Sequence, residues 1–263
     1  MHESILLVFI RAPWKHKRCA PVLCVPTAVF TMNFLTLNIN AIVAALAMGI
    51  GLIWFGQSMG VFFFGVMFWF VLLSAMVTLA GKRFKQNAGL YEKSRGVRNV
   101  VANGMWPLIM SALFYAALIS GHIHYELFAA LGFVSSVAAV ASDTFSSELG
   151  VLDGQPVMLL TLKKVHKGTS GGVTWLGLVA GFAGSALVAA MMLAVLPELH
   201  ILGLNNALPA FIAVVLGGFA GTLVDSVLGY FEEKGIGNKY TSNFFGSIGG
   251  SLICLAVAVA IGI

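Results

Sequence analysis

Charged residues are scarce in this sequence. Of its 263 residues, 15 are Lys or Arg and 10 are Asp or Glu, together 10% of the chain, while 59% are hydrophobic. Soluble globular domains carry about 25% charged residues, so the composition excludes that class. Because lipid satisfies no backbone polar groups, a chain of this kind is expected to cross the bilayer as helices.

Cysteine is also scarce, and so are signs of N-terminal processing. The three cysteines form an odd set and predict neither a disulfide framework nor a metal site. The first 31 residues lack a long apolar run after a basic start, so no cleaved signal peptide is expected. We interpret residues 1–31 as a basic extension, and Met32 is an alternative start.

Long apolar runs, in contrast, are abundant. A transmembrane helix needs about 20 mostly apolar residues. Seven runs qualify, near 35–56, 60–80, 99–120, 125–142, 172–197, 207–230 and 243–263. The sequence therefore predicts an all-α bundle of about seven transmembrane helices within residues 32–263.

Positive charge is confined to one set of connections. All 15 Lys and Arg residues precede the first run or lie in 81–98, 143–171 and 231–242. Basic loops stay in the cytoplasm, so the N-terminus and these three loops are expected on the cytoplasmic side of the plasma, or inner, membrane. Topology thus accounts for the net charge of +5, and no nucleic-acid partner is expected.

Three acidic residues end apolar runs. The stretch "ASDTFSSELG" places Asp143 and Glu148 after the fourth run, and Asp225 lies late in the sixth. A carboxylate near hydrocarbon costs about 3 kcal/mol unless it is paired or coordinated. Interhelical ion pairs or shallow, solvated positions are one explanation, and a functional site is the other. Oxygen ligands favour Mg²⁺ over zinc, which makes these three residues candidate metal ligands.

Two basic stretches are suited to phosphate. In "KKVHKGTSGGVTWLG", Lys163 and Lys167 precede small residues that open the fifth run, and a glycine-rich helix start attracts anions, although the P-loop spacing is absent. Arg95 and Arg98 precede Asn103 at the third run, and Arg can clamp a phosphate with two hydrogen bonds. A positive-inside signal explains the lysines equally well. Asn243 is the first residue of the last apolar run, so it either caps that helix or contacts a ligand.

Together these stretches resemble the integral-membrane family that includes the plant phytyl-phosphate kinase of vitamin E synthesis, over about residues 35–263. The residues that match its pattern are Asp143, Thr144, Ser147, Glu148 and Gly150; Gly168, Thr169, Gly171, Gly172 and Val173; Asp225, Ser226 and Gly229; and Arg95, Gly96, Asn103 and Gly104. Ser170 stands where many relatives carry Asn, and the loop 231–242 is short and acidic. Nucleotide preference and substrate shape therefore stay open.

The resemblance implies Mg²⁺-dependent phosphoryl transfer from a nucleoside triphosphate, CTP in the plant enzyme, to a phytyl or other isoprenoid monophosphate. Asp143, Glu148 and Asp225 would hold Mg²⁺, Lys163 and Lys167 would neutralise charge, and Arg95 and Arg98 would clamp the acceptor phosphate. The remaining expected phosphate-binding residues are Asn103, Gly168, Thr169, Ser170, Gly171, Gly172, Ser226 and Asn243. A cation-coupled transporter, a CTP-dependent lipid cytidylyltransferase and a non-catalytic scaffold remain alternatives.

Overall fold

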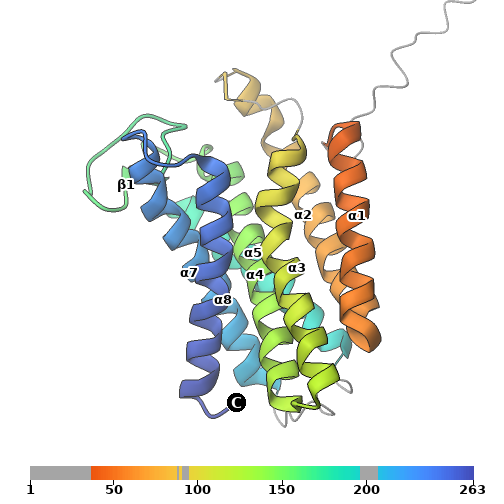
Figure 1. Cartoon of the computed structure of the whole chain (residues 1–263). Coiled ribbons are helices and arrows are strands. Elements are labelled where there is room, and N and C mark those ends of the chain that lie inside the picture. Colours follow the sequence, from red (N-terminus) through yellow and green to blue (C-terminus); the bar gives the residue numbers. More distant parts are fainter. Residues whose placement is uncertain (1–36, 88, 91–94, 196–206) are drawn as a thin grey trace, which may run out of the picture. The chain divides into compact units, whose positions relative to one another are not determined.

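The structure, a computed structural model, describes residues 37–87, 89–90, 95–195 and 207–263. The expected extension, residues 1–31, lies outside this part. The described elements are, in chain order, α1 (Ile39–Gly56), η3 (Gln57–Met59), α2 (Gly60–Asn87), α3 (Val97–Ser120), α4 (Ile123–Gly150), β1 (Val157–Met158), β2 (Gly172–Val173), α5 (Trp175–Ala189), η4 (Ala190–Val195), α7 (Ala207–Glu232) and α8 (Lys239–Ala260). Figure 1 shows the long helices standing side by side.

Six segments of the described residues are long and apolar enough to cross a membrane. The first, Ile39–Lys82, has 44 residues. As one straight helix it would extend about 66 Å, roughly twice the hydrocarbon thickness of about 30 Å. It is instead a hairpin, because α1 ends at Gly56, the next residue Gln57 has a φ of 49°, and α2 runs back beside α1 (Figure 1). With these two helices counted separately, the expected all-α membrane bundle of about seven spans is confirmed.

Helix α4 lies at the centre of the bundle. Of its membrane-spanning window, 89% is buried inside the protein, and it packs against α2, α3, α5, α7 and α8. The sequence allows this because its middle consists mainly of Ala, Gly, Ser and Val, which let neighbouring helices approach closely. Two buried hydroxyls link α4 to α8: Ser135 Oγ donates to the Gly250 carbonyl at 3.0 Å, and Ser251 Oγ donates to the Gly132 carbonyl at 3.0 Å.

Glycines bring α7 and α8 against this central helix. A Cβ atom on Gly221 would lie 2.5 Å from Ala139 Cβ and 2.7 Å from the Gly246 carbonyl oxygen. Contacts that short are not tolerated, so only glycine fits where α4, α7 and α8 meet. The close packing fixes the relative positions of the polar residues that lie further along the same three helices.

The two ends of the bundle differ in chemistry. Toward the end where α2 begins, Phe63 stacks on Phe133 with ring centroids 4.3 Å apart and meets Phe114 edge-on at 5.3 Å. At the opposite end, which is uppermost in Figure 1, α2, α4 and α7 finish and α3, α5 and α8 begin. The polar residues singled out from the sequence lie toward this loop-bearing end.

Two helices extend beyond the apolar runs that predicted them. The fourth run was expected to end at 142, but α4 continues to Gly150, so "ASDTFSSELG" is helical rather than part of a loop. Similarly, α2 continues to Asn87. Hydropathy reports burial in lipid, whereas Thr144 and Glu148 in the last turns of α4 are polar and are buried inside the protein. The chain then forms a short antiparallel pair, β1 with β2, which matches Val157 with Val173 and Met158 with Gly172.

Candidate functional site

A polar cavity of about 320 Å³ opens at the loop-bearing end of the bundle. Its walls come from α2, α3, α4, α7 and α8 and from the loop that connects α4 to α5. All the site residues expected from the sequence border it except Lys163 and Arg98, which are exposed elsewhere on the surface. The chain therefore gathers the polar stretches 95–103, 143–150, 167–172 and 225–243 around one space.

Asp143 of α4 and Asp225 of α7 form the acidic part of the site. Their carboxyl groups are close enough for a side-chain hydrogen bond, and Asp225 Oδ1 is buried with no hydrogen-bond partner among the described residues. Each lies seven residues before the end of its helix, a rise of about 10 Å, so both stand at the same depth. The positive charges of Arg95 and Lys239 act on Asp143 from the same cavity.

Glu148 belongs to a different cluster from the two aspartates. Its carboxylate lies 2.8 Å from Lys85 Nζ and 3.2 Å from Arg95 Nη2. Five residues along an α-helix correspond to a rotation of about 140°, so Asp143 and Glu148 project from different faces of α4. Among the described residues no three acidic, His or Cys side chains converge to hold a metal ion. The expected set of three carboxylate ligands thus reduces to Asp143 and Asp225.

The two aspartates nevertheless fit a hard divalent cation. Two carboxylates in contact need a proton or a cation between them, and an unpartnered carboxylate oxygen is the kind of ligand that Mg²⁺ prefers. The remaining oxygens in the cavity come from amide and hydroxyl side chains, which are also suitable ligands. Asp143 and Asp225 are therefore the residues that would hold the ion.

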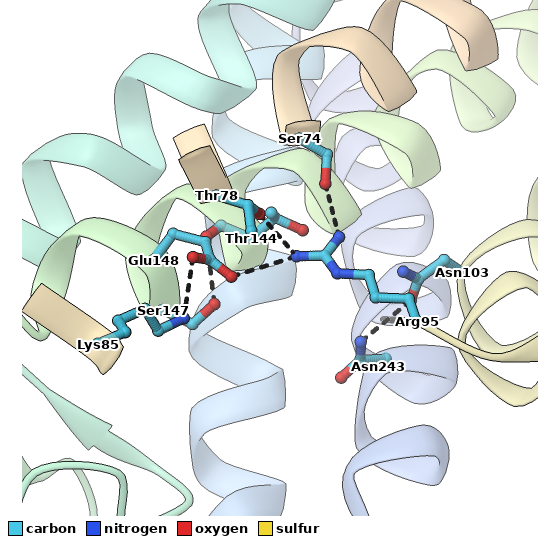
Figure 2. A network of polar contacts seen from close by, with 9 residues as sticks. All are labelled: Ser74, Thr78, Lys85, Arg95, Asn103, Thr144, Ser147, Glu148 and Asn243. Atoms are coloured by element: carbon cyan, nitrogen blue, oxygen red, sulfur yellow. Dashed lines mark hydrogen bonds and ion pairs between the residues drawn. The ribbon is translucent and has the colours of Figure 1, made fainter. Parts of the chain in front are cut away.

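Arg95 is held in place from three directions (Figure 2). Its Nη1 donates to Ser74 Oγ at 2.6 Å, and its Nη2 donates to Thr78 Oγ1 and to Glu148 Oε1, both at 3.2 Å. A guanidinium has five N–H donors, so donors remain for a ligand in the cavity. A fixed arginine loses little side-chain entropy when it binds an anion.

The contribution of α2 was not expected, because none of the site residues predicted from the sequence lies on this helix. Ser74, Thr78 and Lys85 are all on α2. The signal was their spacing: positions separated by four and then seven residues lie on one face of a helix. This spacing was not recognised because Ser74 and Thr78 lie within the apolar run near 60–80, whereas Lys85 was expected in the loop 81–98.

Asn103 and Asn243 join α3 to α8 across the cavity. Asn243 Nδ2 donates to Asn103 Oδ1 at 3.0 Å (Figure 2). The interpretation of Asn243 as a helix cap is wrong, because α8 begins at Lys239 and its cap is Asn238, which accepts from the N–H groups of Tyr240 and Thr241. Asn243 lies one turn inside α8, and its side chain borders the cavity.

The glycine-rich loop borders the cavity, but most of its amides are already used. The N–H of Ser170 donates to Glu233 Oε1 at 2.8 Å, and the N–H groups of Thr169 and Gly172 donate to carbonyls within the loop. Gly171, at φ +76°, packs on α7, where a Cβ atom would lie 2.5 Å from the Ser226 carbonyl oxygen. Three of the five amides of residues 168–172 are therefore already engaged, and the hydroxyls of Thr169 and Ser170 also border the cavity.

Lys167 and Asp153 form hydrogen bonds at two helix ends beside the cavity, the C-terminus of α4 and the N-terminus of α5. Lys167 Nζ donates to the carbonyls of Val151 and Asp153 at 2.9 and 2.5 Å, just beyond the C-terminus of α4. The Asp153 carboxylate accepts from the N–H of Leu176 at 3.1 Å, in the first turn of α5. A carboxylate thus already occupies the helix N-terminus that was expected to attract phosphate. Lys85, Arg95 and Lys239 border the cavity together with Lys167, whereas Lys163 does not.

The chain is similar in sequence to proteins of three organisms. It is 34% identical over 186 residues to an uncharacterised membrane protein of Methanocaldococcus jannaschii, covering 70% of this chain and 71% of the relative. It is 31% identical over 199 residues to an uncharacterised membrane protein of Synechocystis, covering 74% and 70%. Protein PGR of Arabidopsis thaliana is 33% identical over 183 residues, which cover 61% of this chain and 60% of that protein.

No solved structure matches the chain. The family described as "Integral membrane protein DUF92" matches residues 22–260, which include every described helix and the whole cavity lining. The chain therefore belongs to the integral membrane protein family DUF92.

Proposed function

We propose that this protein transfers a phosphoryl group from a nucleoside triphosphate, with CTP favoured, to an isoprenoid monophosphate, in a reaction that depends on Mg²⁺. The observation that carries the proposal is one cavity in which the contacting pair Asp143 and Asp225 faces the fixed guanidinium of Arg95. Acidic side chains alone repel phosphates, and basic ones alone bind any anion. Their combination is what phosphoryl transfer requires.

The position of the cavity fits a lipid phosphate. Asp143 lies about 10 Å below the end of α4, while the cavity opens at that end and has helices of the membrane bundle for walls. An isoprenoid chain can stay among the apolar helix surfaces while its phosphate reaches the polar residues. A water-soluble nucleotide can approach the same residues from the loop-bearing side.

Each cationic group has a part in this proposal. Lys85 and Arg95 share the single negative charge of Glu148, so the cluster keeps one net positive charge beside the cavity. Arg95, already oriented, would bind the acceptor phosphate. Lys239 and the hydroxyls of Thr169 and Ser170 would contact the nucleotide phosphates from the opposite loops.

Asp143 and Asp225 would hold Mg²⁺, which when bound neutralises charge on the phosphates and thereby stabilises the transition state. A monophosphate acceptor is already an anion at neutral pH, so the site needs no strong general base. The chain's residues would work by holding donor and acceptor in line and by opposing the charge that develops during transfer.

The side of the membrane is part of the proposal. Basic residues gather in the loops at the end where the cavity opens, namely after α2, α4 and α7. The positive-inside rule would place that end in the cytoplasm, where nucleoside triphosphates are abundant. We expect the plasma, or inner, membrane as the location.

The test is transfer of label to lipid. The protein purified in detergent is incubated with Mg²⁺, CTP or ATP, and phytyl or farnesyl monophosphate, with the label in separate reactions at the γ- or the α-phosphate. Label from the γ position in a lipid diphosphate supports the kinase. Label from the α position would support a lipid cytidylyltransferase instead. No label from either position with any donor would contradict both and favour transport assays in liposomes.

A further inference from the structure

A second, smaller cavity lies against the two aspartates. Its volume is about 10 Å³, and it is bordered by Asp143, Asp225, Asn243 and Ser247 together with small or apolar residues of α4, α7 and α8. About one probe sphere fills such a space, which is enough for a single water molecule or a single ion. The four polar side chains that border it all carry oxygen atoms.

Asn243 has one amide atom left for a ligand in this space. Its Nδ2 is engaged by Asn103 Oδ1 at 3.0 Å, so the Oδ1 atom at the other end of the amide is the available acceptor. Figure 2 shows this oxygen directed away from Asn103. Asn243 borders both cavities, as Asp143 and Asp225 do.

The packing of α8 brings Asn243 within reach of the aspartates. Gly246, three residues further on the same helix face, lies against α7: a Cβ atom there would be 3.1 Å from Asp225 Cβ. A larger side chain would push α8 away and withdraw the amide. The orphaned Asp225 Oδ1 is an independent indication that a ligand is needed at this point, because it is buried without a partner among the described residues.

We infer that Asn243, oriented by Asn103, supplies the third oxygen ligand for a divalent cation held by Asp143 and Asp225, and that Glu148 is not a ligand. This inference rests on the proposed function and deepens it. The ion would be held by three helices, α4, α7 and α8. The fourth helix, α3, would act only through the hydrogen bond that orients the Asn243 amide.

The test measures Mn²⁺ binding to the full chain in detergent, from the electron paramagnetic resonance signal of free Mn²⁺. Asn243→Ala is expected to weaken binding about tenfold or more, and Asn103→Ala less strongly, since outer partners of metal ligands affect affinity in this range. Asn243→Asp keeps an oxygen at the site and adds charge, so it should bind Mn²⁺ at least as tightly as the original chain. Glu148→Gln removes the ion pairs with Lys85 and Arg95 and so lowers stability, but the protein that remains folded should bind Mn²⁺ within about twofold of the original affinity. Size-exclusion profiles check that each variant is folded.

The inference is overturned if Asn243→Ala binds Mn²⁺ with the original affinity, if Asn243→Asp weakens binding, if Glu148→Gln weakens it as strongly as Asp143→Asn, or if the original chain binds no Mn²⁺. The outcome is separate from that of the proposed function. Mn²⁺ binding lost in Asn243→Ala, with no lipid labelled by the original chain, supports the cation site and contradicts the transfer reaction. Lipid labelling together with unchanged Mn²⁺ binding in Asn243→Ala supports the reaction and contradicts this ligand.

Discussion

The ammonium group of Lys85 lies 2.8 Å from the carboxylate of Glu148, so an ion pair joins the C-terminal turns of α2 and α4. Arg95, at the start of α3, completes the cluster from the other side of Glu148. The three side chains are between 8% and 19% exposed, which means that water screens them poorly. The cluster holds three helix ends in place around the cavity.

Replacing Glu148 with Gln should destabilise the protein strongly. The change leaves Lys85 and Arg95 without their shared counter-charge, and breaking a buried pair in this way costs about 3–5 kcal/mol. Glu233→Gln, at an exposed position, is the matched control and should cost less than about 1 kcal/mol. Thermal unfolding in detergent measures both. Equal melting temperatures for the two variants would contradict the structural role of the cluster.

A methyl group added at Gly221 should disturb the contact among α4, α7 and α8. The new Cβ atom would lie 2.5 Å from Ala139 Cβ, and overpacking of this kind costs about 1–3 kcal/mol. Gly65→Ala in α2 is the control, because nothing lies within 4 Å of its Cβ position. We expect a lower melting temperature for Gly221→Ala and no decrease for Gly65→Ala. The reverse order would show that the helices are packed differently.

Asp153 should make stability depend on pH. The N–H groups of Gly154 and Leu176 donate to its carboxylate and hold the pKa of Asp153 below its ordinary value of 3.8. A lowered pKa in the folded state stabilises the protein fully above 3.8, and this contribution is lost as the pH falls through the folded-state pKa. Asp153→Asn should therefore show a smaller loss of melting temperature on acidification. An unchanged pH profile would contradict the capping role at α5.

Lys167 should matter for stability more than for phosphate binding. Its ammonium group binds carbonyls next to the C-terminus of α4, a position where a cation is worth about 0.3–1 kcal/mol. Lys167→Met should lower the melting temperature accordingly and change the nucleotide KM by less than about threefold. Lys163→Met, whose side chain is exposed and away from the cavity, should change neither. A large increase in KM with unchanged stability would restore Lys167 to the phosphate site.

The fold was largely predictable because hydropathy and helix length are properties of contiguous sequence. The runs near 99–120 and 207–230 correspond closely to α3 and α7. The apolar pattern missed the last turns of α2, which continues to Asn87, and those of α4 from Asp143 to Gly150. In α4 the polar side chains of Thr144 and Glu148 are buried in protein, so hydropathy no longer follows the helix.

Which polar residues meet was less predictable, because it depends on rotation about each helix axis and on which helices are neighbours. Asp143 and Glu148 are close in sequence, yet they separate because they project from different faces of α4. Lys85 and Glu148 are 63 residues apart and form an ion pair. The glycines of residues 168–172 suggested a phosphate cradle, but Gly171 is required for packing on α7. Local composition did not distinguish these uses.

The most direct test of the account is phosphoryl transfer by Asp143→Asn and Asp225→Asn, with Asp153→Asn as the matched control outside the cavity. With the original chain and with Asp153→Asn, γ-labelled nucleotide and Mg²⁺ should convert an isoprenoid monophosphate to labelled diphosphate. Either cavity variant should lower the rate about 100-fold or more while remaining folded, because each removes one of the two carboxylates that would hold the Mg²⁺ on which stabilisation of the transition state depends. Transfer at the original rate by folded Asp143→Asn or Asp225→Asn would contradict it.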